Sequence, residues 1–408
     1  MQILISGASI AGPVLAYWLQ RFGFQPTLVE RAATARKTGG HSVDLFRPAI
    51  EIVERMGALP EIQSRSTGTD RMTILREGSS QPIEVNLVHV MAALSDRHLE
   101  IMRDELSEAL HATLGGGVET LFGNSIAALE QDEGGVDVEF ERGPARRFDL
   151  VIGADGLHSA VRRLVFGPES QFSHFIGAYL AVLSLPNYLD LSNRTVLYSA
   201  PRRVVGVYSA RNLPDARAVF LWRSDRPLDV HYRDVPAQKQ CVREAFAGLG
   251  WEVPRLLAEL DQTSAFYFDS ITQLRMDSWS RGRVTLAGDA GYCPGPAVGG
   301  STSLAVVGAY VLAGELAAAR GDYSRAFRGY EAALLDYVKG SREFALQTAR
   351  RLIPESPAGV WLQPHFMRAF AVLPSPVLRV FASLSGLRSR LHDSVQVPDY
   401  SRLAESRA

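Results

Sequence analysis

The sequence predicts an α/β fold in which a nucleotide-binding domain built on parallel strands is interrupted by an antiparallel sheet. Three short apolar segments, residues 2–6, 149–155 and 283–288, each lead into a glycine-containing turn, as buried parallel strands commonly do. Between residues 172 and 280 the pattern changes to β-strands separated by turns rich in Pro, Asn and Arg, without a glycine motif. A sheet of this kind can cover a pocket on the first domain.

The N-terminal segment predicts a strand, a glycine turn and a helix. Residues 2–6 form the strand, Gly7 to Gly12 form the turn, and residues 13–22 carry apolar side chains at helical spacing. Gly7 permits the turn, Gly12 lets the helix pack closely on the strand, and the free N–H groups at the start of the helix favour a diphosphate. Ser9 takes the place of the middle glycine of G-x-G-x-x-G, so a small side chain lies where backbone would approach a pyrophosphate.

The second strand, residues 26–30, supplies the other half of this site. It ends at Glu30, whose carboxylate can accept both hydroxyls of an adenosine ribose. A carboxylate here indicates a ribose rather than a 2′-phosphate, which suits FAD or NAD. The motif alone leaves open a glycine turn that binds nothing, so other segments must decide.

The elements that follow are predicted from turn signals and periodicity. Residues 34–46 predict a loop, and a helix runs from about Pro48 to Met56 with Pro in its first turn. Residues 98–112 predict one amphipathic helix that contains Arg103. The predicted strands are a pair within 71–86, two or three within 119–140 around a hairpin turn at 132–135, and those at 173–185, 194–200, 203–209, 216–223 and 263–270, with helices near 236–248 and 254–260.

Composition limits the classes of partner. At 408 residues the chain is long enough for two packed domains that enclose a large cofactor. Its apolar fraction of 46%, charged fraction of 21% and net charge of −1 give no electrostatic reason to expect nucleic acid. With only Cys241 and Cys293, neither a disulfide framework nor a metal site is predicted. An ordinary secretory signal is not evident, and the longest apolar run, residues 304–314, is too short to span a bilayer, so we expect a cytoplasmic protein.

Two further glycine motifs follow buried strands. Residues 153–162 are G-A-D-G-L-H-S-A-V-R, and residues 288–301 are G-D-A-G-Y-C-P-G-P-A-V-G-G-S. Together with the N-terminal motif and Glu30, their order and spacing resemble the class A flavoprotein monooxygenases of the p-hydroxybenzoate hydroxylase type. The resemblance is to the bacterial branch that includes natural-product hydroxylases and tetracycline-inactivating monooxygenases.

The resemblance implies a Rossmann-like FAD-binding domain, an inserted antiparallel β-sheet substrate domain and C-terminal helices that bridge the two. The implied boundaries are 1–70, 98–171 and 281–330 for the FAD-binding domain, 71–97 and 172–280 for the substrate domain, and 331–408 for the bridging helices. Within the last part, residues 356–392 carry four Arg and no Asp or Glu. Such a segment could lie on an anionic membrane, but docking on the protein itself is the favoured interpretation.

The resemblance also implies cofactor contacts. Glu30 would hold the ribose with Arg31 beside it, and Arg103 would face the pyrophosphate. Asp289 would contact the ribityl chain and pyrophosphate, and Asp155 and Arg162 resemble the family's motif shared between FAD and NAD(P)H binding. The predicted FAD-binding residues are Gly7, Ser9, Gly12, Glu30, Arg31, Asp44, Arg103, Asp155, Asp289, Gly299 and Gly300.

Several residues admit two interpretations. Arg47 could approach the flavin or the nicotinamide, or it could be solvated. Asp44 resembles a flavin-side Asp, or it could be a helix N-cap. Tyr292 could donate to the substrate or flavin, or it could be a core residue. Pro296 keeps its place in the third motif, whereas Gly291 and Tyr292 replace Ala-His and residues 299–303 replace G-Q-G-x-N. Arg47, Tyr292 and Pro296 are the predicted catalytic residues.

With these residues, the resemblance implies FAD-dependent, NAD(P)H-consuming hydroxylation of an aromatic or polyketide-like small molecule through a flavin hydroperoxide. FAD would be tightly bound and NAD(P)H transient, because only one dinucleotide motif is present. The partners would be an aromatic or polycyclic substrate and dioxygen, without nucleic acid or membrane, in a monomer or homodimer. A Baeyer–Villiger oxygenase and a non-catalytic flavin- or ligand-binding protein are the alternatives.

Overall fold

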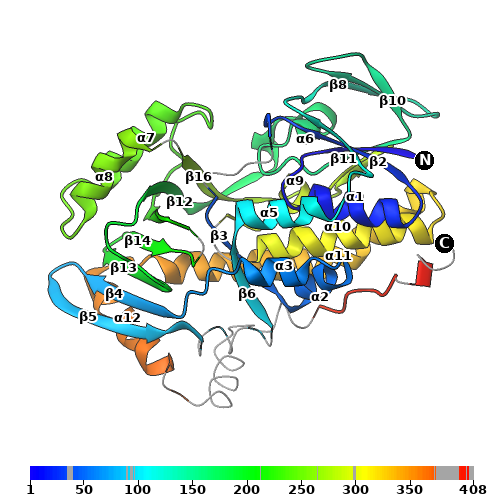
Figure 1. Cartoon of the computed structure of the whole chain (residues 1–408). Helices are drawn as coiled ribbons and strands as arrows, with labels where there is room; N and C mark the ends of the chain where they lie inside the picture. The colour runs from blue at the N-terminus through cyan, green and yellow to red at the C-terminus, as the bar shows by residue number, and fades with distance from the viewer. Residues whose placement is uncertain are drawn as a thin grey trace.

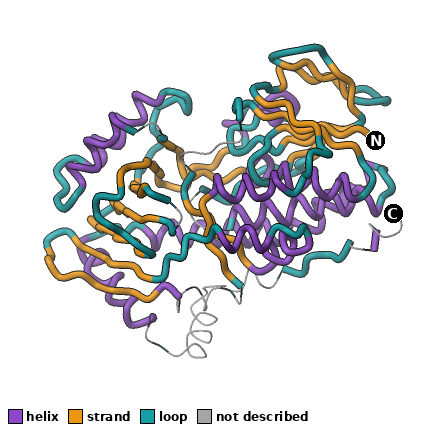
Figure 2. The backbone as a smooth tube through the Cα atoms, viewed as in Figure 1, coloured by secondary structure: helices purple, strands orange, loops and turns teal. Residues whose placement is uncertain are grey.

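A computed structural model describes most of the chain. The described residues are 1–34, 40–88, 91, 95, 97–211, 213–263, 265–296, 300–371, 373, 395–400 and 402–403. Figures 1 and 2 show two sheet regions connected by long helices. The predicted Gly299, together with residue 372 and residues 374–392 of the basic segment, lies outside the described residues.

The first region is a six-stranded sheet that begins with the N-terminal strand. Its order is β17-β18-β11-β1-β2-β7, and all neighbours are parallel except β17 and β18. The strands are β1 (Gln2–Ser6), β2 (Gln25–Glu30), β7 (Glu119–Phe122), β11 (Leu150–Gly153), β17 (Ser280–Arg281) and β18 (Val284–Leu286). The three predicted parallel strands therefore lie side by side in one sheet.

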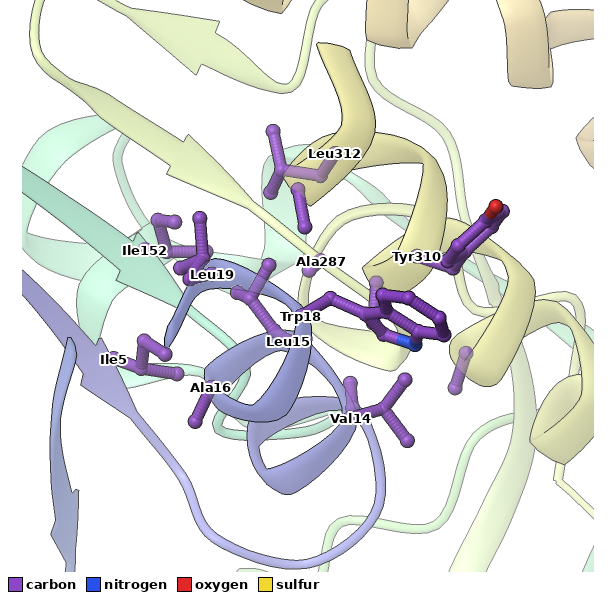
Figure 3. Packing of buried hydrophobic residues seen from close by; sticks show 14 of the residues in the cluster. Ile5, Val14, Leu15, Ala16, Trp18, Leu19, Ile152, Ala287, Tyr310 and Leu312 are labelled. Atoms are coloured by element: carbon purple, nitrogen blue, oxygen red, sulfur yellow. The ribbon is translucent and has the colours of Figure 1, made fainter. Parts of the chain in front are cut away.

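Helix α1 (Ala11–Arg21) packs between this sheet and helix α10 (Ser301–Ala318) (Figure 3). Trp18 of α1 contacts Tyr310 of α10 edge to face, with ring centroids 4.8 Å apart. Close approach explains both predicted glycines. A Cβ on Gly12 would lie 1.9 Å from the carbonyl oxygen of Gly7, and Gly7 itself has φ +103° against Ala154.

The second region is a seven-stranded sheet of order β16-β12-β15-β14-β13-β4-β5. Its neighbours are antiparallel except for the parallel pair β13 and β4. The strands are β4 (Arg71–Arg76), β5 (Ser79–Asn86), β12 (Ser173–Pro186), β13 (Arg194–Ala200), β14 (Arg203–Ser209), β15 (Asp215–Arg223) and β16 (Phe266–Leu274). We call it the substrate sheet, after the substrate domain that the resemblance implies.

Helices cover the substrate sheet on both faces. One face packs on α7 (Val235–Phe246) and α8 (Val253–Gln262) through Phe220, Phe246 and Leu256. On the other face, Ala345 and Ala349 of α11 (Tyr323–Leu352) pack against Leu180 and Ile271. Helix α11 also packs along α10, so it connects the two sheets, and α12 (Pro357–Ala371) contacts β4 and β5 (Figure 1).

The predicted α/β fold class is confirmed, but two local predictions are wrong. Residues 42–46 are strand β3 (Ser42–Phe46) rather than loop, and residues 98–112 are strand β6 (His98–Met102) followed by helix α5 (Arg103–Ala112). Strands β3 and β6 pair antiparallel, with Val43 opposite Ile101. Each strand is stabilised by a partner more than fifty residues away, which local periodicity does not reveal.

The remaining elements are short. A small sheet of β8 (Ile126–Gln131), β9 (Val136–Phe140) and β10 (Arg146–Phe148) contains the predicted hairpin. The short helices are α2 (Arg47–Arg55), α3 (Leu59–Ser64), α6 (Ala160–Val165), η1 (Glu169–Gln171) and α9 (Asp289–Tyr292). Among the described helices α10 alone is long and apolar enough to cross a membrane, but it is mostly buried inside the protein, as a core helix is.

Candidate active site

The carboxylate of Glu30 lies against the glycine turn that precedes α1. Its two oxygens accept hydrogen bonds from the backbone N–H of Ala8 and of Ala32, each at 2.9 Å. The first N–H groups of α1 lack partners within the helix, and they start directly beyond this carboxylate. One end of the site therefore offers a ribose acceptor beside a group of backbone donors.

Arg103 brings a positive charge to the same turn. It begins α5, and its guanidinium donates to the hydroxyl of Ser9 at 3.3 Å. Its backbone N–H donates to the carbonyl of His41, so the start of α5 is attached to the residue just before β3. Ser9 replaces the middle glycine of the motif, and its hydroxyl contacts Arg103, the cation predicted to face the pyrophosphate.

Asp289 approaches from the third motif. Gly288 has φ +64° and precedes α9, so the chain turns sharply after β18 and Asp289 becomes the first residue of the helix. Burial raises the pKa of Asp289, and the nearby Arg103 guanidinium opposes that rise. A hydroxyl, a guanidinium, helix N–H groups and two carboxylates match the diphosphate, ribose and ribityl groups of FAD.

Strand β3 continues the site toward the start of α10. Asp44 pairs with His98 of β6 at 2.7 Å, so it is not the cap of α2, whose N-cap is Phe46. Ser303 of α10 is fully buried and joins this strand twice: it accepts from the N–H of Phe46 at 2.9 Å and donates to the carbonyl of Asp44. Gly300 caps α10 in a left-handed conformation, with φ +88°.

The substrate sheet lies against β3 and the residues that precede it. We call this contact the seam; Gly40, His41 and Ser42 form one side of it, and Tyr208, Arg217 and Tyr267 form the other. Tyr208 of β14 accepts a hydrogen bond from the N–H of Ser42 at 2.8 Å, and the Arg217 guanidinium donates to the carbonyl of Gly40. His41 lies between the two regions, with its ring 5.5 Å from that of Tyr267. Burial and the neighbouring Arg103 lower the pKa of His41 to about 4, so its imidazole is neutral.

Comparison with known proteins identifies the family. A family model described as an FAD binding domain matches residues 1–350. A flavin-dependent monooxygenase of Legionella longbeachae is 39% identical over 368 residues, which cover 90% of each chain. An uncharacterised protein of Mycobacterium tuberculosis is 43% identical over 338 residues, covering 83% of this chain and 90% of the relative. The crystal structure of tetracycline destructase Tet(55) superimposes with a TM-score of 0.82 at 33% identity, covering 98% of both chains.

The chain belongs to the class A FAD-dependent monooxygenases. It is therefore an enzyme with FAD as its cofactor, and its fold is that of the tetracycline destructase. Family membership disfavours the alternative of a non-catalytic flavin-binding protein.

Not every predicted residue of the monooxygenase joins the site. Asp155 holds the start of α6, because its carboxylate accepts from the hydroxyl of Ser159 and from the N–H groups of Ala160 and Val161. Arg31 is exposed beside Glu30. Pro296 is partly exposed, and the three residues after it lie outside the described part of the chain.

The packing of Tyr292 favours the core interpretation over the catalytic one. The residue is fully buried, its hydroxyl is 2.9 Å from that of Tyr330, and its ring centroid is 4.6 Å from that of Trp279. Burial raises the pKa of Tyr292 to about 12. The alternative interpretation, a core tyrosine beneath α10, fits these contacts.

Arg47 begins α2 next to the strand that carries Asp44. Its guanidinium pairs with Glu51 at 3.2 Å, and both side chains are more than one third exposed.

The sequence did not predict a site role for Ser303 or Tyr267. A hydroxyl residue at the start of α10 and a tyrosine on an edge strand are common, so only their contacts mark them.

Proposed function

We propose that this monooxygenase uses NAD(P)H to hydroxylate an aromatic or polyketide-like small molecule. The observation that carries the proposal is the meeting of Ser9, Arg103 and Asp289 at the seam where His41 and Tyr267 face each other. Groups suited to a charged cofactor thus lie next to a partly exposed face of the substrate sheet. The likeness to a tetracycline destructase supports a polycyclic substrate.

In this proposal Glu30 holds the adenosine ribose, and Arg103 with the α1 N–H groups holds the diphosphate. Asp289 holds the ribityl hydroxyls, and Gly300 and Ser303 shape the start of α10 at the ring end. Bound FAD would supply the reaction of reduced flavin with dioxygen, which side chains cannot perform. Arg47 is proposed to lie toward the ring end of the cofactor, where it would assist reduction.

The protein contributes orientation and exclusion of water. The hydrogen bonds from Ser42 to Tyr208 and from Arg217 to Gly40 hold the substrate sheet against β3, which limits solvent access at the seam. The neutral imidazole of His41 can accept a proton there without carrying a charge of its own. We place the enzyme in the cytoplasm, in keeping with the absence of disulfides between its two cysteines.

The proposal is tested with the purified holoenzyme. NADH and NADPH oxidation and dioxygen uptake are measured with tetracycline, 1-naphthol and other phenolic and polycyclic compounds. We expect at least one compound to accelerate NAD(P)H oxidation and to yield a product with one added oxygen atom. Insertion of oxygen beside a ketone would identify the Baeyer–Villiger alternative. Oxidation that no compound accelerates would contradict the proposed substrate class.

A further inference from the structure

Tyr267 lies on β16 where the substrate sheet meets the FAD-binding domain. Its ring faces that of His41, and its phenol is within the electrostatic reach of Arg103 and Asp289. Burial is the main cause that raises the pKa of Tyr267 well above its ordinary value. The side chain is therefore a protonated phenol that is still partly exposed at the seam.

Tyr267 ends a row of residues that crosses the substrate sheet. Val182 of β12 lies opposite it, followed by Val219 of β15 and Gly206 of β14. Val219 is partly exposed, and it packs with Met102, the residue before Arg103. Gly206 adds no side chain, and a Cβ there would come within 2.9 Å of Leu197 Cδ2. Val182 is buried in one cluster with Ala345 of α11, and Leu197 fills the space over Gly206, so Val219 and Tyr267 are the members of the row that are partly exposed.

The hydroxyl of Tyr267 donates its proton within the protein. It donates to Asp269 Oδ2 at 3.3 Å, and the other oxygen of that buried carboxylate accepts from the N–H of Ser270 at 2.8 Å. A phenol has one donor and two acceptor sites. Because its proton is directed to Asp269, the oxygen of Tyr267 remains an acceptor toward the seam.

His158 holds Asp269 from the other domain. It lies in the segment after β11, and its Nε2 is 3.4 Å from Asp269 Oδ2 while its Nδ1 is 3.0 Å from Glu169. Its ring stacks on Tyr232 at 4.4 Å. Burial opposes the charge, but the hydrogen bonds with Asp269 and Glu169 prevail and raise the pKa of His158 to about 10. A cation of the FAD-binding domain thus fixes the carboxylate that orients Tyr267.

We infer that Tyr267 contacts the substrate and accepts a hydrogen bond from a phenolic or enolic hydroxyl on it, with Asp269 and His158 as positioning residues. The inference rests on the proposed function, because it names the substrate chemistry of the same site. A substrate hydroxyl that donates to Tyr267 would keep its ring fixed relative to the cofactor and electron-rich.

The test uses two probes that differ in a hydrogen-bond donor, 1-naphthol and its methyl ether 1-methoxynaphthalene. Their dissociation constants are measured by the change in flavin fluorescence of the oxidised holoenzyme. The wild-type protein should prefer 1-naphthol by about three- to tenfold, the value of one neutral hydrogen bond. Tyr267→Phe should bring the two constants within about twofold, with unchanged FAD content.

Retention of the preference in Tyr267→Phe would overturn the inference and leave the proposed function standing. A wild-type protein that shows no preference, or does not bind 1-naphthol, would also overturn it. The proposed function is judged separately, by the NAD(P)H oxidation that the wider set of compounds stimulates.

The positioning role is tested with His158→Gln. This variant should reduce the naphthol-to-ether preference in the wild-type background and have no further effect in Tyr267→Phe. His174→Gln, an exposed histidine at the start of β12, is the matched control and should change neither constant. An equal loss of affinity for both probes would show that His158 only supports the fold, and would overturn its role in positioning Tyr267. If His158→Gln does not fold, Tyr267→Phe still decides the substrate contact.

Discussion

Arg103 and Arg162 are two arginines of the FAD-binding domain whose surroundings differ. Arg162 is fully buried, and its guanidinium donates to the carbonyls of Ala290 and Leu157 and to the carboxylate of Glu169. The guanidinium of Arg103 donates to the hydroxyl of Ser9, and no carboxylate among the described residues forms an ion pair with it. Removing a buried cation that protein acceptors surround destabilises the fold, whereas a cation without a carboxylate partner is available to an anionic ligand.

The same contrast separates the three carboxylates at the ends of parallel strands, Glu30, Asp155 and Asp289. Asp155 accepts three hydrogen bonds at the start of α6, while Glu30 accepts two from backbone N–H groups, and Glu30 and Asp289 are the carboxylates proposed to hold cofactor hydroxyls. Motif membership therefore does not fix a role. The number of protein partners that a charged side chain already has is the better guide.

The largest effect is expected for Arg162→Ala. The change leaves Glu169 without its buried partner and the carbonyls of Leu157 and Ala290 without a donor, at a cost of about 3–5 kcal/mol in the free energy of unfolding. Urea denaturation of the apoprotein measures it. If Arg162→Ala instead kept full stability and lost FAD, the two arginines would have to exchange roles.

Asp289→Ala should act on the cofactor rather than on the fold. It removes a charge-assisted contact, so the free energy of FAD binding should become less favourable by about 1.5–3 kcal/mol. The FAD dissociation constant should then rise roughly ten- to a hundredfold. Stability of the apoprotein should hold, because the buried carboxylate has a raised pKa and gains little from its neighbours. An unchanged FAD titration would remove Asp289 from the site.

A smaller change in FAD affinity is expected for Glu30→Ala, about 1–2 kcal/mol, because one carboxylate contact to the ribose is lost. The control is Glu54→Ala on α2, whose carboxylate pairs with Arg97 at the surface, 2.9 Å away. An exposed pair of this kind contributes little. If Glu30→Ala and Glu54→Ala changed the FAD affinity equally, Glu30 would not be the residue that holds the ribose.

The smallest effect on binding is expected for Arg47→Ala. The exposed pair with Glu51 contributes little to stability, so FAD should be retained. Stopped-flow measurement with NADPH should show slower flavin reduction or more peroxide release per turnover. Loss of FAD from a folded variant would instead move Arg47 to the diphosphate.

The sequence predicted those parts of the molecule that depend on neighbours along the chain. The turn from Gly7 to Gly12 and the carboxylate at the end of β2 are local features, and the structure brings them together. The substrate sheet was also predictable, because alternation of apolar residues marks each strand. The domain boundaries drawn from these patterns stay a prediction.

Features that depend on distant partners were missed. Strand β6 continues without a break into α5, so residues 98–112 look like one amphipathic helix until β3 is seen to pair with the first five. For Tyr292 the sequence left a catalytic and a core interpretation open, and its contacts with Trp279 and Tyr330 favour the core one. The link from His158 to Tyr267 joins segments more than one hundred residues apart.

We expect Arg103 to bind the diphosphate of FAD and Arg162 to support the fold. Calorimetric titration of wild-type and Arg103→Gln apoprotein with FAD and with riboflavin, which lacks the diphosphate, separates the two roles. Arg103→Gln should weaken FAD binding by about tenfold or more and leave riboflavin binding within about twofold. An equal loss for both ligands, or no loss for FAD, would contradict the account.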